Sequence, residues 1–508
     1  MSAFTDRTTL PNLGSGHVVV DQTLTKDPLD VVRLLAPVLN SAYPSKNPTS
    51  VEDDEDDEDD IETEDLADYS FTAMQRCPSL TASQDSLTPA TTPSPSKAAF
   101  FGSDPVADAA LEVDSIKSTH GTVLVVGVGF VGAHLMECFS SAYEVVAFDV
   151  SENRCQYLRK LHCNNPNVTF ISDLEADDRT KAFDLCLISV PTLLTSDLSQ
   201  VDQTHIRSAF NMVARIAQPG STVVVESSVT VGMTRELFSA LLAKGVHVGF
   251  SPERVDPGRT LPAFQEIPKV VSGLDTPSLH RITELYSRVF SKFVPVSKPE
   301  VAEFTKLYEN CQRLINIAYV NEIADACAKH GVDVHEVVMA SATKPFGFMP
   351  YTPSLGAGGH CIPVNPFYLF ANCDLPLLRT AALANQQRPV EKAVEVAEIA
   401  TQNHTALGKQ GKPKVAVMGM GFKRGEASLA YAPTVTLADK LTELGVEVSY
   451  VDEYVTSEKW GKVDMEDFRN AEKFDGMFDA VVVAQKPIAS ELAILEQLKF
   501  AKVVYFTK

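Results

Sequence analysis

Residues 123–132 read Val-Leu-Val-Val-Gly-Val-Gly-Phe-Val-Gly. The apolar run at the start is typical of a strand buried on both faces of a parallel sheet. A helical segment over 133–141, a second strand over 144–148 and then Asp149 follow. The stretch therefore predicts a strand, a glycine-rich turn, a helix, a second strand and an acid, in that order.

Each glycine of this G-x-G-x-x-G pattern has its own role. Gly127 permits a tight turn, Gly129 lets a pyrophosphate approach the backbone, and Gly132 lets the helix pack closely on the strand. The N-terminus of the helix would then face the phosphates. Asp149 can accept a hydrogen bond from a ribose 2′-hydroxyl and would repel a 2′-phosphate, so the unit favours NAD over NADP. A glycine turn that binds no nucleotide is the alternative.

Further strands are predicted at 185–190, 222–226 and 247–250, separated by helical stretches, which indicates a doubly wound α/β sheet. Ligands bind at the carboxyl edge of such a sheet. Polar segments follow these strands at 190–192, 226–230 and 251–254. Glu253 is there a candidate acid or base, although its position would equally suit a surface loop.

Residues 300–388 have a helical pattern, with one long helix predicted over 301–330. Lys306 and Asn310 share a face of it, four residues apart. They would stabilise a developing oxyanion if that face met a reacting group, and are otherwise surface residues. The glycine-rich segment 356–366 then places Cys361 where a thiolate could attack a bound molecule. A structural loop with an ordinary thiol is the alternative.

A second, smaller Rossmann-like unit is predicted from Lys414 onward, with strands near 415–419, 446–451 and 480–484. Its Gly419-x-Gly421 lacks the third glycine, so we expect it to bind a different nucleotide or a diphosphate. The fold expected is therefore α/β, with two Rossmann-like doubly wound domains joined by a helical middle domain. The expected boundaries are 118–297 for the NAD domain, 298–402 for the helical middle and 403–508 for the second unit.

Residues 1–117 are expected to form a disordered acidic and Ser/Pro-rich extension, because Glu52–Asp60 is an unbroken acidic run. A short amphipathic helix over 27–43 is its one structured candidate. The net charge of −22 makes nonspecific nucleic-acid binding unfavourable. No membrane span or signal peptide is predicted. Nine cysteines without a C-x-x-C pair indicate reduced thiols, a cytoplasmic location and no metal site.

Taken together, the motifs resemble the UDP-glucose/GDP-mannose dehydrogenase family over about residues 120–500. Ser251-Pro-Glu-Arg-Val-Asp-Pro-Gly258 and Gly358-Gly-His-Cys-Ile-Pro363 resemble the branch that acts on UDP-N-acetylglucosamine or a related N-acetylhexosamine. The resemblance implies that a sugar 6-hydroxymethyl is oxidised to a carboxylate with two NAD⁺. It also implies a homodimer, or a higher homo-oligomer, formed through the long helix.

The resemblance assigns roles to residues. Cys361 would form a thiohemiacetal and then a thioester, Lys306 and Asn310 would hold the oxyanion or a water, and Glu253 would assist hydrolysis. It implies cofactor contacts at Gly127, Gly129, Phe130, Val131, Gly132, Asp149, Arg154, Pro191, Thr192 and Ser228, and substrate contacts at Arg254, Gly358, Gly359, His360 and Lys423.

The chain departs from the family pattern at three places. Asn365 stands at a catalytic position where the family usually has an aspartate, and an amide cannot act as a base. Ala430 stands where an arginine would clamp the nucleotide sugar. Val503–Phe506 replaces an acid and an Arg-Asn pair. These changes leave two alternatives to an active UDP-sugar 6-dehydrogenase: a regulatory paralogue that binds NAD or UDP-sugar but turns over poorly, and an enzyme whose last domain reads another substrate.

Overall fold

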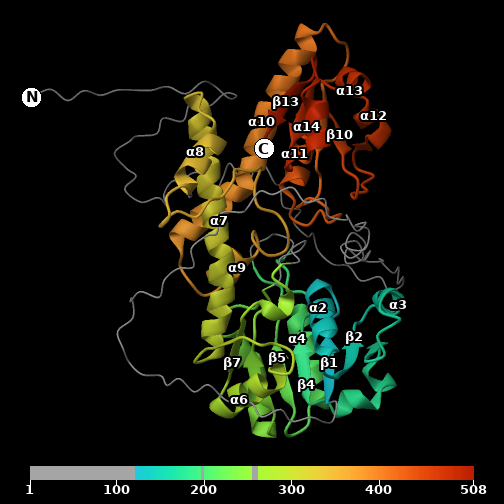
Figure 1. The fold of residues 1–508 in the computed structure, drawn as a ribbon, viewed down its shortest axis with the longest axis vertical. Helices are drawn as coiled ribbons and strands as arrows, with labels where there is room; N and C mark the ends of the chain where they lie inside the picture. The colour runs from blue at the N-terminus through green and yellow to red at the C-terminus, as the bar shows by residue number, and fades with distance from the viewer. Residues whose placement is uncertain (1–120, 196–199, 255–260, 508) are drawn as a thin grey trace, which may run out of the picture. The chain divides into compact units, whose positions relative to one another are not determined.

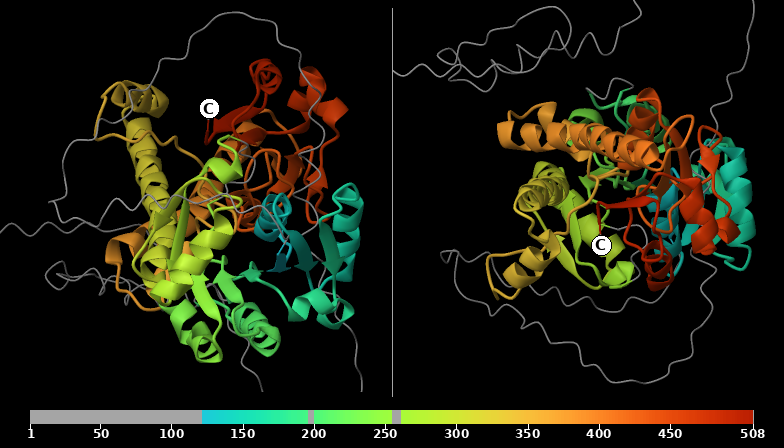
Figure 2. Two further views of the ribbon diagram at one scale, coloured as in Figure 1. Left: turned by 60° about the horizontal axis from the view of Figure 1, so that its bottom comes forward. Right: turned by 90° about the horizontal axis from the view of Figure 1, so that it is seen from above.

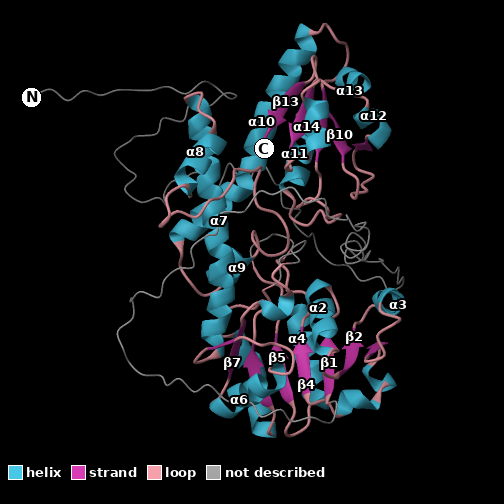
Figure 3. Ribbon diagram, viewed as in Figure 1, coloured by secondary structure: helices cyan, strands magenta, loops and turns pink. Residues whose placement is uncertain are grey.

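The computed structural model of the protein describes residues 121–195, 200–254 and 261–507 (Figure 1). These residues form two β-sheets, and a helical segment lies between them in the chain (Figure 3). The expected extension over 1–117, its helix at 27–43 and residues 255–258 of one motif lie outside the described residues. Among the described residues, no helix is both long and apolar enough to cross a membrane.

The N-terminal sheet has, among the described residues, the strand order β3-β2-β1-β4-β5-β6-β7-β8. Neighbouring strands are parallel except β6 and β7, which are antiparallel. The chain order reverses direction between β1 and β4, which is where doubly wound sheets bind ligands. The strands are β1 (Thr122–Val126), β2 (Glu144–Phe148), β3 (Val168–Ile171), β4 (Leu185–Ile188), β5 (Thr222–Val225), β6 (His247–Phe250), β7 (Lys269–Gly273) and β8 (Phe293–Pro295).

Helices cover both faces of this sheet (Figure 2). Alternate side chains of β1 enter two separate cores: Leu124 and Val126 face one, Val123 and Val125 the other. Burying one such side chain contributes about 1.5–3 kcal/mol, which explains the unbroken apolar run. The helical elements are α2 (Phe130–Phe139), α3 (Glu152–Leu161), α4 (Thr204–Ile216), α5 (Met233–Phe238) and α6 (Thr276–Tyr286), with 3₁₀ turns η2 (Leu174–Ala176), η3 (Asp178–Lys181), η4 (Ser239–Lys244) and η5 (Phe264–Glu266).

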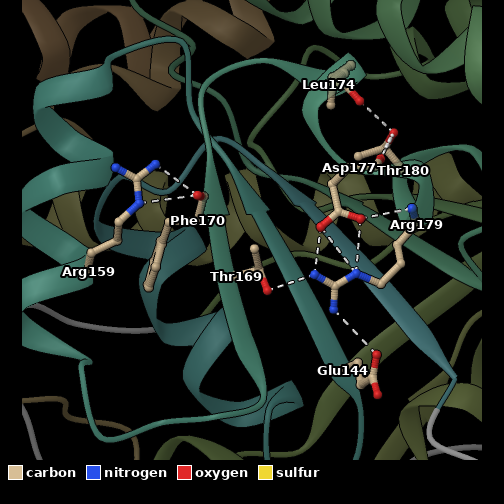
Figure 4. Close-up of polar contacts among 8 residues, drawn as sticks. All are labelled: Glu144, Arg159, Thr169, Phe170, Leu174, Asp177, Arg179 and Thr180. Carbon is tan, nitrogen blue, oxygen red and sulfur yellow. Dashed lines mark hydrogen bonds and ion pairs between the residues drawn. The ribbon is translucent and has the colours of Figure 1, made fainter.

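The edge strand β3 is covered by arginines, as Figure 4 shows. Arg159 of α3 donates to the Phe170 carbonyl through Nε (3.3 Å) and Nη2 (2.9 Å). Arg179 donates to the Thr169 hydroxyl at 2.7 Å and pairs with Asp177 at 2.6 Å. Charged groups on an edge strand discourage pairing with another chain, so these arginines disfavour the addition of a further strand at β3.

Four helices follow in the middle of the chain. The long helix predicted over 301–330 is present as α7 (Pro299–Lys329), and α8 (Val334–Ala342) comes next. The short α9 (Asn365–Phe370) follows the cysteine loop directly. No separate helix was predicted where α10 (Pro376–Ala406) lies. This helix contains Pro389 and continues across residue 402, where a domain boundary was expected.

The C-terminal sheet has the order β11-β10-β9-β12-β13 among the described residues, and all its neighbours are parallel. It is the Rossmann-like unit expected from Lys414 onward. In place of a helix directly after the glycines, a loop over 419–432 precedes α11, which fits the missing third glycine. The elements are β9 (Lys414–Met418), α11 (Pro433–Glu443), β10 (Glu447–Val451), β11 (Gly461–Lys462), α12 (Met465–Arg469), α13 (Ala471–Met477), β12 (Ala480–Val483), α14 (Ala489–Leu495) and β13 (Lys502–Tyr505).

Asp479, buried directly before β12, links this sheet to α10. Its carboxylate contacts His404 Nδ1 at 2.9 Å, Lys409 Nζ at 2.9 Å and the Lys414 amide at 2.8 Å. Burial alone raises the pKa of Asp479, but hydrogen bonds from Lys409, Lys414 and His404 outweigh it and hold the pKa below its ordinary 3.8. The ionised carboxylate therefore stabilises the folded state at neutral pH.

We predict that Asp479→Asn lowers the free energy of unfolding by about 2–3 kcal/mol at pH 7, because Lys409 loses its buried counter-ion. A carboxyl with a depressed pKa stabilises the fold above its unfolded-state pKa and loses that effect as pH falls. The difference in the free energy of unfolding between Asp479→Asn and wild type should thus become smaller below about pH 3.8. Urea unfolding at pH 7 and pH 3.5 measures it. Glu447→Gln, which removes an exposed pair with Lys414, is the control and should change stability by less than about 1 kcal/mol. An equal effect of both variants at pH 7 would contradict the prediction.

Candidate active site

The glycine-rich loop between β1 and α2 has the geometry that a dinucleotide needs. Gly127 has φ +86°, and a Cβ on Gly132 would lie 1.9 Å from the Gly127 carbonyl oxygen. A Cβ on Gly129 would have no atom within 4 Å. Two glycines are therefore required by the fold, whereas Gly129 leaves open space that a phosphate can fill.

Asp149 closes this loop from the end of β2. One carboxylate oxygen accepts from the Val128 amide at 3.0 Å, and the other accepts from the Ser151 amide at 3.0 Å. The side chain stays partly exposed, so a ribose hydroxyl can still reach its remaining lone pairs. The Asp149 carboxylate, as an acceptor for a ribose hydroxyl, and the open space at Gly129 together fit the NAD expected from the sequence.

The other expected cofactor residues lie around this loop. Phe130 and Val131 form the first turn of α2, where the Phe130 ring lies 4.6 Å from that of His134. Arg154 is buried, and its Nε donates to the Val128 carbonyl at 3.0 Å. Arg154 thus stabilises the glycine-rich loop through its Val128 carbonyl. The sequence did not suggest this role.

The segments after β4 and β5 lie beside each other. The Ser227 hydroxyl donates to the Val190 carbonyl at 2.8 Å. Pro191 is exposed, and Ser228 is half-buried. The Thr192 carbonyl accepts from the hydroxyl of Tyr368 on α9 at 2.6 Å. This last bond joins the carboxyl edge of the N-terminal sheet to the helix that follows Cys361.

Glu253 and Lys306 meet at the same edge. The Lys306 ammonium donates to the Glu253 carbonyl at 2.6 Å and lies 3.6 Å from a Glu253 carboxylate oxygen. Both side chains are buried. Burial lowers the pKa of Lys306, but the charges of Glu253, Cys361 and Glu309 outweigh it, so the pKa lies above its ordinary value. The cationic form of Lys306 is therefore favoured, and its charge acts on Cys361.

Asn310, one turn further along α7, faces Asn365. Its Nδ2 donates to the Asn365 Oδ1 at 2.5 Å, and both side chains are buried. The shared face of Lys306 and Asn310 is thus turned inward, as the oxyanion hypothesis requires. Asn365 is a neutral amide at the position where the family resemblance implied a carboxylate. Its side-chain oxygen accepts the hydrogen bond from Asn310.

The cysteine loop is held from two sides. The Gly359 amide donates to the Ala430 carbonyl at 2.9 Å, and a Cβ on Gly359 would lie 2.9 Å from the Phe422 ring. Asn385 of α10 accepts from the Ala357 amide at 2.7 Å and donates to its carbonyl at 3.2 Å. Cys361 itself is exposed, and its carbonyl accepts from the Asn365 amide at 2.9 Å at the start of α9. A rigid backbone therefore presents an accessible thiol.

The expected substrate residues fall into two groups. Gly358, Gly359 and His360 precede the thiol, and the His360 ring lies edge-on to Tyr431 at 6.1 Å. Arg254 is already paired, at 2.5 Å from a carboxylate oxygen of Glu309 on α7. Lys423 is half-buried in the loop after β9, and a Cβ on Gly358 would contact the neighbouring Phe422.

Several residues around the site were not given a role by the sequence. Asn385 holds the cysteine loop, and Tyr368 joins α9 to Thr192. Glu303 of α7 accepts from the Gly232 and Thr234 amides at 2.6 and 3.0 Å. Lys269, at the start of β7, lies 2.6 Å from a carboxylate oxygen of Glu226. Within the described ranges, no group of three or more His, Cys, Asp or Glu side chains is arranged to hold a metal ion.

We predict that Gly129→Ala leaves the melting temperature unchanged but lowers NAD⁺ affinity at least about tenfold, since the added methyl group meets the pyrophosphate rather than the protein. Gly132→Ala should instead destabilise the domain, because its methyl group collides with the Gly127 carbonyl. Calorimetric titration with NAD⁺ and thermal unfolding without it separate the two effects. Gly476→Ala, with no atom near its Cβ, is the control. Wild-type NAD⁺ binding by Gly129→Ala would refute the assignment of this loop.

Comparison with known proteins agrees with this geometry. Residues 121–292 match the NAD binding domain of the UDP-glucose/GDP-mannose dehydrogenase family, and residues 300–387 match the family's central domain. Protein CapL of Staphylococcus aureus is 32% identical over 353 residues, which cover 65% of this chain and 81% of the relative. UDP-N-acetyl-D-glucosamine 6-dehydrogenase of Pseudomonas aeruginosa is 30% identical over 358 residues, 66% of this chain and 83% of the relative.

Solved structures share the fold. The UDP-D-ManNAc dehydrogenase of Pyrococcus horikoshii has a TM-score of 0.66 at 24% identity, covering 76% of this chain and 95% of the relative. The UDP-glucose dehydrogenase of Pyrobaculum islandicum also has a TM-score of 0.66, at 21% identity, covering 78% of this chain and 96% of the relative. The chain therefore belongs to the UDP-glucose/GDP-mannose dehydrogenase family of oxidoreductases, and residues 121–292 are its NAD-binding domain.

Proposed function

We propose that the protein is an NAD-dependent nucleotide-sugar 6-dehydrogenase that oxidises a UDP-N-acetylhexosamine, or a UDP-hexose, to the uronic acid. The observation that carries the proposal is the convergence of Glu253, Lys306 and Cys361, in which a buried ammonium interacts with both a carboxylate and a thiol. The substrate class rests on relatives named UDP-N-acetyl-D-glucosamine 6-dehydrogenase and UDP-N-acetyl-D-mannosamine dehydrogenase.

NAD⁺ held at the Gly127–Gly132 loop would supply the hydride acceptor for each of two oxidations. In the first, the 6-hydroxymethyl loses a hydride, and its hydroxyl proton passes to water, to give an aldehyde. The Cys361 thiolate then adds to the aldehyde carbon, and the oxyanion formed is stabilised by Lys306 and Asn310. Loss of the second hydride gives a thioester on Cys361. Water attacks it, the thiolate leaves, and Glu253 accepts a proton, which yields the carboxylate.

The C-terminal sheet would hold the UDP part. Asp452, after β10, accepts from the Met420 amide at 2.8 Å and from the Tyr454 and Val455 amides at 2.9 Å. Asp149 closes the NAD loop in the same way. The similarity of the loops at Asp452 and Asp149 supports a second nucleotide site. At this site Ala430 replaces the expected arginine, so the diphosphate would lack that positive contact.

A regulatory paralogue is the second candidate, and the pairing of Asn310 with Asn365 favours it. Asn365 replaces the expected carboxylate and is buried. Such a protein would bind NAD⁺ and a UDP-sugar with little turnover.

We predict that the purified protein forms two NADH per UDP-N-acetylhexosamine. Cys361→Ser should lower the rate at least about 1000-fold, because a hydroxyl is a far weaker nucleophile and leaving group than a thiolate. NADH absorbance with a panel of UDP- and GDP-sugars measures both. Cys163→Ser, at another exposed cysteine, should keep wild-type activity. If no sugar yields NADH while NAD⁺ still binds, the regulatory candidate replaces the enzyme.

We also propose a homodimer, or a higher homo-oligomer, formed through α7. Val301, Phe304 and Tyr308 are exposed on one face of this helix and line a surface hollow of about 410 Å³. Apolar side chains gathered on a surface mark contact sites.

We predict that wild-type protein sediments as a dimer or larger species, and that Phe304→Asp/Tyr308→Asp shifts it toward monomer by placing charges in the contact. Phe500→Asp, at an exposed phenylalanine of the C-terminal domain, is the control. Sedimentation velocity measures the outcome, and a wild-type monomer would refute this assembly.

A further inference from the structure

A fully buried ion pair lies beneath the site, and the proposed reaction does not use it. Lys269, at the start of β7, lies 2.6 Å from a carboxylate oxygen of Glu226, which directly follows β5; their side chains are 3% and 0% exposed. The other Glu226 oxygen accepts from the Tyr286 hydroxyl at 2.6 Å. Apolar side chains of similar volume would often be as stabilising as a buried pair, so this pair calls for a reason beyond stability.

The Lys269 ammonium makes a second hydrogen bond, and it reaches the loop that carries Glu253. Lys269 Nζ donates to the Pro252 carbonyl at 3.2 Å. On one side of Pro252, the Ser251 hydroxyl donates to the Val270 carbonyl at 2.7 Å; on the other, the Glu253 carbonyl accepts from Lys306 at 2.6 Å. Each of these consecutive residues is therefore hydrogen-bonded, and two of the donors are lysine ammonium groups.

The Glu253 carboxylate has little else to hold it. One of its oxygens has no hydrogen-bond partner among the described residues, and the other has the 3.6 Å contact with Lys306. Its place next to Lys306 is thus set mainly by the backbone of its own loop. The Lys269 ammonium also lies 5.7–6.0 Å from the ring centres of Phe264, Tyr286 and Phe290, within the range of cation–π attraction.

We propose that Lys269, held by Glu226, is a positioning residue that fixes the Pro252 carbonyl and thereby places Glu253 against Lys306. The proposal rests on the dehydrogenase function above, in which Glu253 accepts a proton during thioester hydrolysis. A displacement of about 1 Å at such a group can lower a rate about 100-fold.

The charges around Glu253 determine how the pair should be removed. Glu253 faces Lys306 of α7, on which the charges of Glu309 and Cys361 also act. It also acts on Glu226, which follows β5 and pairs with Lys269 of β7, while Arg254 is paired with Glu309. The double variant Glu226→Gln/Lys269→Met removes one negative and one positive charge. The net charge near Glu253 is unchanged, so an altered pH dependence reports a displaced Glu253.

The test uses the full chain with this double variant. We expect a melting temperature within about 5 °C of wild type, NAD⁺ affinity within about twofold, and kcat lowered about 10- to 100-fold. The midpoint of the kcat–pH profile should move by more than about half a pH unit. Tyr143→Phe is the control, since it removes a buried hydrogen bond to the Leu285 carbonyl in the same domain and should match wild type throughout.

A second readout needs no turnover. The rate at which iodoacetamide alkylates Cys361, followed by mass spectrometry of its peptide across a pH series, reports the Lys306 ammonium beside the thiol. We expect the double variant to shift this profile and Tyr143→Phe to leave it unchanged. Failure of the dehydrogenase proposal would appear as a wild-type protein without NADH formation, whereas the alkylation profile still tests the positioning role.

A stable double variant with wild-type kcat–pH and alkylation profiles would overturn the proposal. If the double variant does not fold, Tyr286→Phe decides, because it removes one hydrogen bond to Glu226 and no charge. A smaller shift of the alkylation profile in the same direction then supports the positioning role, and an unchanged profile overturns it.

Discussion

The contact between Lys306 and Glu253 is the constraint on which the rest of the site depends. It joins the long helix α7 to the loop after β6, and burial by itself disfavours the Lys306 cation. The cation persists because Glu253 and Cys361 lie close enough to offset the loss of hydration. The Lys306 ammonium is therefore the charged group to which both the Glu253 carboxylate and the Cys361 thiol are coupled.

The surrounding fold serves to bring three distant segments to this contact. The doubly wound sheet delivers Glu253 at its carboxyl edge, α7 delivers Lys306 and Asn310, and Asn385 of α10 fixes the cysteine loop through both backbone groups of Ala357. Pro389 in α10 has no amide hydrogen, so the Asn385 carbonyl lacks its usual partner within the helix.

The sequence predicted those parts of the fold that have a local pattern. The apolar run before Gly127, the glycine turn and the long helix over 301–330 each show their period or spacing directly, and all are present. The pair of Glu226 with Lys269 and the contact of Asn385 with Ala357 could not be predicted, because each joins residues far apart in the chain. Arg154 shows the same limit: the resemblance implies a cofactor contact for it, and the bond from its buried side chain to the Val128 carbonyl, 26 residues away in the chain, had no local pattern.

The central claim is that oxidation passes through a thioester on Cys361. Asn365 cannot act as a base, so hydrolysis of that thioester should be slow and the intermediate should accumulate. The direct measurement is mass spectrometry of the Cys361 peptide after acid quenching of protein mixed with NAD⁺ and a UDP-N-acetylhexosamine. Our account predicts a uronyl adduct on Cys361 in wild type and less of it in Asn365→Asp. Unmodified Cys361 while NADH accumulates would contradict it.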